Sequence, residues 1–232
     1  MDKVKEFLFS KQDLNYREFS SKLIPTVKIE NIVGVKVPEL RKFSKFLLKE
    51  DKMYVEEYLN DLPHKYIEEY HIHMYLLSEE KDIDILIKRL EKVLPFIDNW
   101  ETCDIGMGKI AKKYPCIVEK KVYEWLKSEH VYTMRFAIVT LMTKFIKENF
   151  SEDHLKILSE IQTDEYYVNI AIAWYFCECY AKNEKEVLFY LENNMIINDW
   201  VHNKAIQKMK ESLKIDKDKK VYLNTLKRKL NR

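Results

Sequence analysis

Apolar residues recur at helical spacing along almost the whole chain. Phe43, Phe46 and Leu47 form one example, with the polar residues Ser44 and Lys45 between them. This spacing gives a helix one apolar face, whereas the alternation that marks a β-strand is scarce. Only 3 glycines and 5 prolines occur in 232 residues, so few tight turns or long loops can form. These features predict an all-α protein.

The predicted helices fall into pairs. Pro38, Pro63, Pro115 and the cap-like Ser151 mark helix starts. The pairs recur roughly every 30 to 45 residues, as in stacked helical hairpins. They are 38–49 with 52–60, 64–78 with 82–93, 102–114 with 116–128, 130–148 with 152–161, and 165–181 with 184–192, followed by helices 198–213 and 217–230. We expect one domain over residues 1–232, a right-handed α-solenoid of HEAT-like repeats whose inner helices line a concave basic groove. A compact irregular helical bundle is the alternative.

Charge and cysteine content identify no partner by themselves. The 40 basic and 38 acidic residues leave a net charge of +2, so affinity for phosphates depends on local clusters. The four cysteines lack the spacing of a zinc site and are expected to be reduced and buried. We expect neither a metal nor a cofactor. Since no apolar run approaches the length of a membrane span, we expect a cytoplasmic protein without a membrane partner. We also expect it to be a monomer.

One stretch stands out as a candidate site. The stretch Asp98–Gly106 holds a tryptophan and a carboxylate, Trp100 and Asp104, and two of the three glycines, Gly106 and Gly108, lie at its end or just beyond it. Trp100 and Asp104 are four apart, so on a helical turn both side chains face the same ligand. A second tryptophan, Trp174, lies in an apolar predicted helix, and a lone basic residue, Arg135, interrupts another apolar run.

Each of these residues also has a purely structural interpretation. Asp104 could cap a helix or pair with Arg135, and Arg135 could be a buried structural cation. Trp100 and Trp174 could belong to the core. The combination of the four favours a functional site.

Four motifs carry a family resemblance. They are Gly34-Val35-Lys36-Val37-Pro38-Glu39-Leu40-Arg41, Asn99-Trp100-Glu101-Thr102-Cys103-Asp104, Met134-Arg135-Phe136-Ala137 and Ile172-Ala173-Trp174. In this order the sequence resembles the DNA alkylation repair family, the HEAT-like-repeat glycosylases that excise N3- and N7-alkylated purines from duplex DNA. The resemblance runs from about Gly34 to the C-terminal helices.

The resemblance implies a role for each candidate residue. Asp104 matches the catalytic carboxylate, Trp100 and Trp174 the aromatics that flank the deoxyribose of the lesion, and Arg135 a contact on the DNA backbone. The chemistry agrees, because a carboxylate stabilises the oxocarbenium-like sugar that forms as the glycosidic bond breaks. Aromatic faces attract the same positive charge. The family leaves the lesion in the duplex, unlike enzymes that flip the base.

Lysines could complete a DNA-binding strip. On the predicted helix 102–114, Lys109, Lys112 and Lys113 follow Asp104 at spacings that place them near one another. Lys144 and Lys204 could extend the strip towards further phosphates. The alternative is an ordinary solvated face.

The N-terminal region departs from the family pattern. Only 33 residues precede Gly34, fewer than in the active glycosylases, so the sequence resembles a shortened branch for which activity is not implied. Three hypotheses therefore stay open. The favoured one is a monofunctional DNA glycosylase; the others are a non-catalytic protein that recognises distorted or branched DNA and a protein-binding solenoid.

Overall fold

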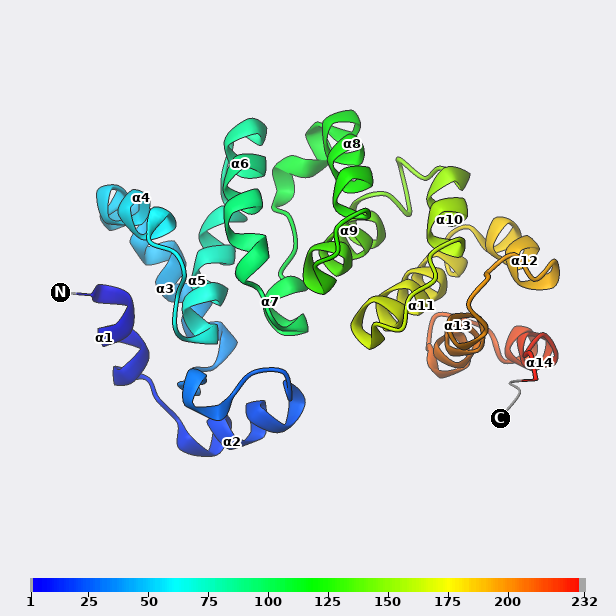
Figure 1. The fold of residues 1–232 in the computed structure, drawn as a ribbon, viewed down its shortest axis with the longest axis horizontal. Helices are drawn as coiled ribbons and strands as arrows, with labels where there is room; N and C mark the ends of the chain where they lie inside the picture. The colour runs from blue at the N-terminus through cyan, green and yellow to red at the C-terminus, as the bar shows by residue number, and fades with distance from the viewer. Residues whose placement is uncertain (1, 230–232) are drawn as a thin grey trace. The chain divides into compact units, whose positions relative to one another are not determined.

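The computed structural model describes residues 2–229, and all regular structure in that range is helical. The chain divides into two compact units, Met1–Tyr114 and Pro115–Arg232, whose helices are labelled in Figure 1. The expectation of an all-α protein is confirmed. Within the described range, no helix has the length and apolar character needed to cross a membrane.

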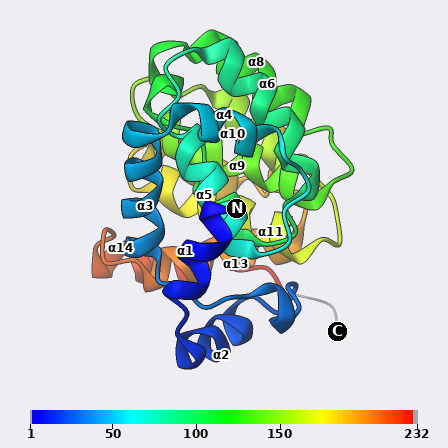
Figure 2. The same ribbon diagram turned by 90° about the vertical axis from the view of Figure 1, so that its left-hand side faces the viewer.

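The first unit contains seven α-helices and three short 3₁₀ helices in its described part. They are α1 (Lys3–Ser10), α2 (Leu14–Leu23), η1 (Ile29–Asn31), α3 (Val37–Glu50), α4 (Lys52–Asn60), α5 (Ile67–Leu77), α6 (Ile83–Val93), η2 (Leu94–Phe96), α7 (Trp100–Cys103) and η3 (Lys109–Lys113). Helix α5 is the centre of the unit, since α1, α3, α4, α6 and α7 all pack against it. Figure 2 shows α3 and α5 beside each other.

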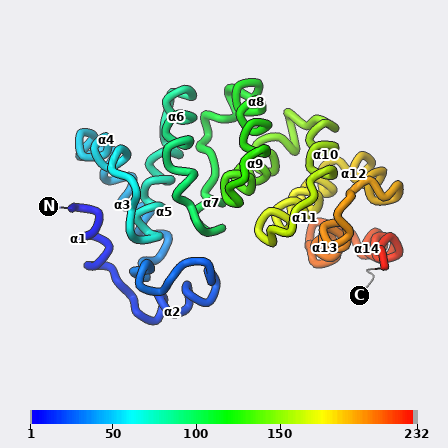
Figure 3. The backbone as a smooth tube through the Cα atoms, viewed as in Figure 1, coloured from blue at the N-terminus to red at the C-terminus, as the bar shows by residue number. Residues whose placement is uncertain are grey.

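The second unit is built around α11. Its helices are α8 (Pro115–Trp125), α9 (Val131–Lys144), α10 (Glu152–Ser159), α11 (Tyr166–Tyr180), α12 (Glu184–Glu192), α13 (Asp199–Glu211) and α14 (Lys217–Thr225). Both α9 and α13 pack extensively on α11, and Figure 3 traces the three in succession with α10 and α12 between them. The interior of α11 is apolar, with Tyr175 and Phe176 completely buried.

Side-chain caps explain many of the helix starts. Asp13 accepts a hydrogen bond from the Tyr16 N–H at 3.0 Å, and Asn99 accepts one from the Thr102 N–H at 2.8 Å. Such caps satisfy N–H groups that have no partner within the helix. The predicted starts near Pro38, Pro115 and Ser151 are confirmed.

Helix α5 begins later than predicted. Residue 64 was the expected start, but the first helical residue is Ile67. The reason is a cap, since the Glu69 carboxylate accepts hydrogen bonds from the backbone N–H groups of Lys65 at 3.0 Å and Tyr66 at 2.8 Å. These contacts hold both residues outside the helix.

The prediction of one helix over 102–114 is wrong. Helix α7 ends at Cys103, and a turn leads to η3 at Lys109. Gly106 adopts a φ of +69°, which ends a right-handed helix. Gly108 lies so close to α5 that an added Cβ would be 2.1 Å from the Ser78 carbonyl oxygen. Asp104 and the three following lysines therefore do not share a helix.

The cysteine prediction is correct for three of four residues. Cys103, Cys177 and Cys179 are buried cysteines outside any disulfide, and Cys116 is exposed on α8. Among the described residues, no group of three or more histidine, cysteine or acidic side chains could hold a metal ion.

Candidate functional site

Helix α7 presents Trp100 and Asp104 together. The Asp104 N–H donates to the Trp100 carbonyl at 2.9 Å, so one α-helical turn separates the two residues, as the sequence predicts. Thr102 and Cys103 point inward and are completely buried, whereas Trp100 and Asp104 are partly exposed. The inward pair anchors the turn, and the opposite face carries a carboxylate next to an indole.

Trp100 also holds the N-terminal segment. Its indole Nε1–H donates to the Leu23 carbonyl at 3.1 Å, and its ring packs against a cluster of Ile24, Val27, Ile32 and Ile67. Part of the indole is therefore occupied by intramolecular contacts.

A buried carboxylate fixes the next part of that segment. Glu68 on α5 accepts hydrogen bonds from the backbone N–H groups of Val33 at 3.0 Å, Gly34 at 2.6 Å and Val35 at 3.3 Å. Burial raises the pKa of Glu68, while these three N–H groups oppose the rise. Gly34 has a φ of +94° and lies against the start of α2, where an added Cβ would be 2.4 Å from the Asp13 carbonyl oxygen. The motif that begins at Gly34 thus forms the docking point of α2.

A second carboxylate adjoins Trp100. Burial raises the pKa of Glu101, and the nearby Glu68 raises it further. Glu101 and Glu68 line one very small cavity together with Tyr16 and His71. Glu101 and Asp104 are both partly exposed, but Glu101 lines this internal cavity with Glu68, whereas Asp104 does not.

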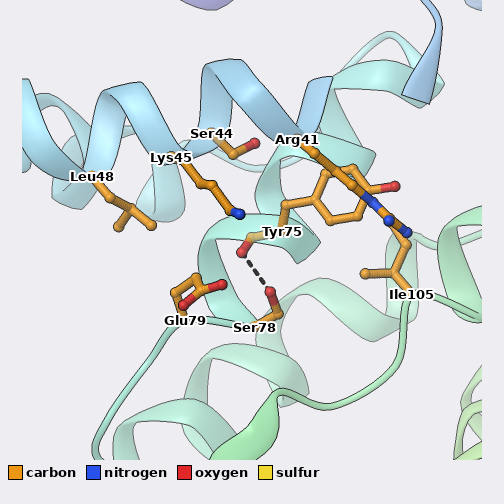
Figure 4. Close-up of a pocket in the computed structure, with 8 residues that line it drawn as sticks. All are labelled: Arg41, Ser44, Lys45, Leu48, Tyr75, Ser78, Glu79 and Ile105. Carbon is orange, nitrogen blue, oxygen red and sulfur yellow. Dashed lines mark hydrogen bonds between the residues drawn. The ribbon is translucent and has the colours of Figure 1, made fainter. Parts of the chain in front are cut away.

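A cationic pocket lies beside Asp104 in the same unit. It has a volume of about 260 Å³ and is lined by Arg41, Ser44, Lys45, Leu48, Tyr75, Ser78, Glu79 and Ile105. Figure 4 shows the Lys45 ammonium directed from α3 towards α5, with Arg41 alongside the Tyr75 ring. The Arg41 guanidinium carbon is 5.2 Å from that ring's centroid. Burial raises the pKa of Tyr75, and Arg41 opposes this change.

Sequence reasoning did not select this pocket. Arg41 belongs to a motif of the family resemblance, and Lys45 follows at the spacing that places both on one face of a helix. That signal was present, but the contribution of Tyr75 and Ser78 from α5 depends on the packing of two helices.

Arg135 and Trp174 lie on neighbouring helices of the second unit. Arg135, on α9, is only 4% exposed, and its Nη1 donates to the Tyr167 carbonyl at 2.8 Å. Trp174, on α11, is partly exposed. The structure therefore places Trp100 with Asp104 in one unit and Arg135 with Trp174 in the other. That the two pairs meet around one ligand stays a prediction.

The predicted lysines have different surroundings. Lys109, Lys112 and Lys113 are exposed on η3. Lys144 is the last residue of α9 and is partly buried. The Lys204 ammonium lies 5.7 Å from the Trp200 ring centroid and donates to Gln207 Oε1 at 3.2 Å.

These features define an all-helical protein in which a short helical turn presents an indole and a carboxylate beside a cationic pocket. The sequence pattern of the DNA alkylation repair enzyme family matches residues 10–210, which include parts of both units. The chain belongs to this family, and the resemblance drawn from its four motifs is confirmed. Membership supports a role in DNA repair. A comparison with curated proteins finds no match.

Proposed function

We propose that the protein binds double-stranded DNA and hydrolyses the N-glycosidic bond of N3- and N7-alkylated purines. The observation that carries the proposal is the turn of α7, where Asp104 and Trp100 share a partly exposed face. Family membership supplies the link to alkylated DNA. A partly exposed carboxylate beside an aromatic ring suits a reaction that develops positive charge on a sugar.

The chemistry needs little from the protein besides electrostatic stabilisation. An alkylated purine carries a positive charge, so it leaves with the electrons of the C1′–N bond and needs no proton from an acid. The sugar then becomes oxocarbenium-like, and the Asp104 carboxylate stabilises it. Water adds to C1′, and its proton passes to that carboxylate or to solvent. Trp100 and Trp174 would flank the deoxyribose.

We further propose that the two units stack as one HEAT-like solenoid domain whose inner helices form a concave groove for the duplex. Such a groove would bring Trp174 towards Asp104. In this arrangement Arg135 would act at the DNA backbone near the lesion, and the lysines of η3, Lys144 and Lys204 would contribute further positive charge along the duplex.

A non-catalytic DNA-binding protein is the second candidate. Two observations favour it. The Trp100 indole N–H is already bonded to the Leu23 carbonyl, and the Arg135 guanidinium is buried with a bond to the Tyr167 carbonyl. Side chains held by such intramolecular hydrogen bonds could shape a surface that recognises distorted or branched DNA by its backbone and its shape.

Base release from methylated DNA separates the two candidates. The wild-type protein, in excess over methylated duplex, should release alkylated purine, and Asp104→Asn should reduce the rate at least a hundredfold. Asp84→Asn, an exposed carboxylate on α6, is the matched control and should keep the wild-type rate. Absence of release by the wild-type protein, together with binding to branched duplex, would select the second candidate.

A further inference from the structure

The pocket between α3 and α5 holds two cations without a carboxylate partner. Among the described residues, neither Arg41 nor Lys45 forms an ion pair. The two serine hydroxyl groups of the pocket already donate to backbone carbonyls, Ser44 to Leu40 at 2.9 Å and Ser78 to Tyr75 at 2.7 Å. The charged donors that remain for a ligand are thus the guanidinium and the ammonium. Glu79 also lines the pocket, which leaves a net charge of +1 there.

We infer that this pocket binds one backbone phosphate of the DNA strand, an inference that rests on the proposed binding of duplex DNA. A guanidinium offers a planar fork of donors that matches phosphate oxygens, and an ammonium adds a point charge. The pocket, at about 260 Å³, is smaller than the sites of roughly 300–1,000 Å³ that enclose whole small molecules. Its size and its open cationic wall therefore suit a single anionic group.

Two contacts make the pocket a preformed site. Arg41 lies against the face of Tyr75, which restricts the guanidinium before any ligand arrives and so reduces the entropic cost of binding. On the other side, the close approach of Gly108 to Ser78 holds the α7–η3 turn on the end of α5.

The same turn connects the pocket to the candidate catalytic residue. Ile105 lines the pocket and directly follows Asp104. A phosphate held by Arg41 and Lys45 therefore lies next to the sugar that Asp104 would face. Arg41 and Lys45 are positioning residues in this scheme, because they fix the strand and do not touch the breaking bond.

Binding of a short fluorescein-labelled duplex, measured over a range of salt concentrations, tests the inference. The variant Arg41→Gln/Lys45→Gln should bind roughly tenfold or more weakly at low salt, as expected for lost hydrogen bonds between charged groups. The slope of log K against log salt should fall in magnitude by about 0.9, the value for one phosphate contact. Lys88→Gln, which removes an exposed charge from α6, is the control and should leave affinity nearly unchanged.

Neutral methylphosphonate linkages, placed one at a time along the duplex, identify the phosphate. One position should weaken binding to the wild-type protein and have no effect on the double variant. Equal affinity and equal salt slope for wild type and double variant would overturn the inference while DNA binding itself stands. Failure of the wild type to bind any duplex would instead overturn the proposed function. Weakened binding by the variant, with no base release from either protein, would support the pocket and reject the glycosylase.

Discussion

Removal of the Glu68 carboxylate should release the N-terminal segment from α5. Glu68 is 3% exposed, and its two oxygens accept hydrogen bonds from three consecutive backbone N–H groups. The first and last of these belong to Val33 and Val35, which are 1% and 2% exposed. In Glu68→Ala, the N–H groups lose their acceptor at a site that water does not reach.

The size of the effect follows from these contacts. A buried donor left unpaired costs about 1–3 kcal/mol. Three such donors together would cost more free energy than the remaining contacts of the segment with α5 contribute. The segment is expected to detach instead, which limits the loss in the free energy of unfolding to about 3–5 kcal/mol. Glu68→Gln keeps one acceptor oxygen but turns an NH₂ group towards a donor, so we expect a loss of about 1–2 kcal/mol.

Urea unfolding and amide hydrogen exchange measure both parts of this prediction. Exchange should accelerate over residues 14–36 in Glu68→Ala and stay slow in α11. Glu18→Ala, an exposed carboxylate on α2, should change the free energy of unfolding by no more than about 0.5 kcal/mol. If Glu68→Ala has the urea midpoint of the wild type and unchanged exchange over residues 14–36, then this carboxylate does not hold the segment.

Two further perturbations act on the same unit. Gly108→Ala places a Cβ 2.1 Å from the Ser78 carbonyl oxygen, so it should cost about 2–4 kcal/mol and weaken DNA binding; an unchanged melting temperature would contradict the close packing. Burial lowers the pKa of His71 and of His73 to about 3, whereas an unfolded histidine titrates near 6.5. The unfolded chain therefore takes up more protons as the pH falls below about 6.5, and the free energy of unfolding should drop by about 2 kcal/mol per histidine between pH 7 and pH 5. His71→Leu should remove its share of that pH dependence in urea melts, and an unaltered pH profile would refute the assignment.

Helical periodicity predicted most elements of the fold because it depends on residues close in sequence. The shared face of Trp100 and Asp104 could be predicted in the same way, because it depends on a single helical turn. The break after Cys103 could not be predicted from local sequence. A glycine within a helix costs only about 1 kcal/mol, so Gly106 and Gly108 looked compatible with a helix over 102–114. In the structure Gly106 leaves the helical region with a φ of +69°, and the turn that results packs Gly108 against Ser78, thirty residues earlier in the chain.

The role of Glu68 could not be predicted from the local sequence pattern, for a related reason. An acidic residue in the first turn of a helix is ordinarily solvated and favoured by the helix dipole. Here the segment from Ile32 to Val35 covers the Glu68 carboxylate. No residue close to Glu68 in the sequence indicates that contact. The cationic pocket could be predicted only in part. The spacing of Arg41 and Lys45 on α3 is visible in the sequence, whereas the part of the pocket that α5 contributes is not.

Helix α5 links these findings physically. Its first turn binds the N-terminal segment through Glu68. Tyr75 in its last turn and Ser78 at its C-cap line the cationic pocket, and Ser78 also lies against Gly108 of the α7–η3 turn. The helix is buried along nearly its whole length, and interiors packed at this density transmit displacements instead of absorbing them. A change at Glu68 that shifts α5 should therefore alter the pocket at Arg41, and a change at Trp100 should loosen the segment that Glu68 holds. For the candidate site, this predicts that stability and the proposed binding of DNA depend on the same helix. A variant of α5 can be assigned to function only when its free energy of unfolding is measured beside its affinity.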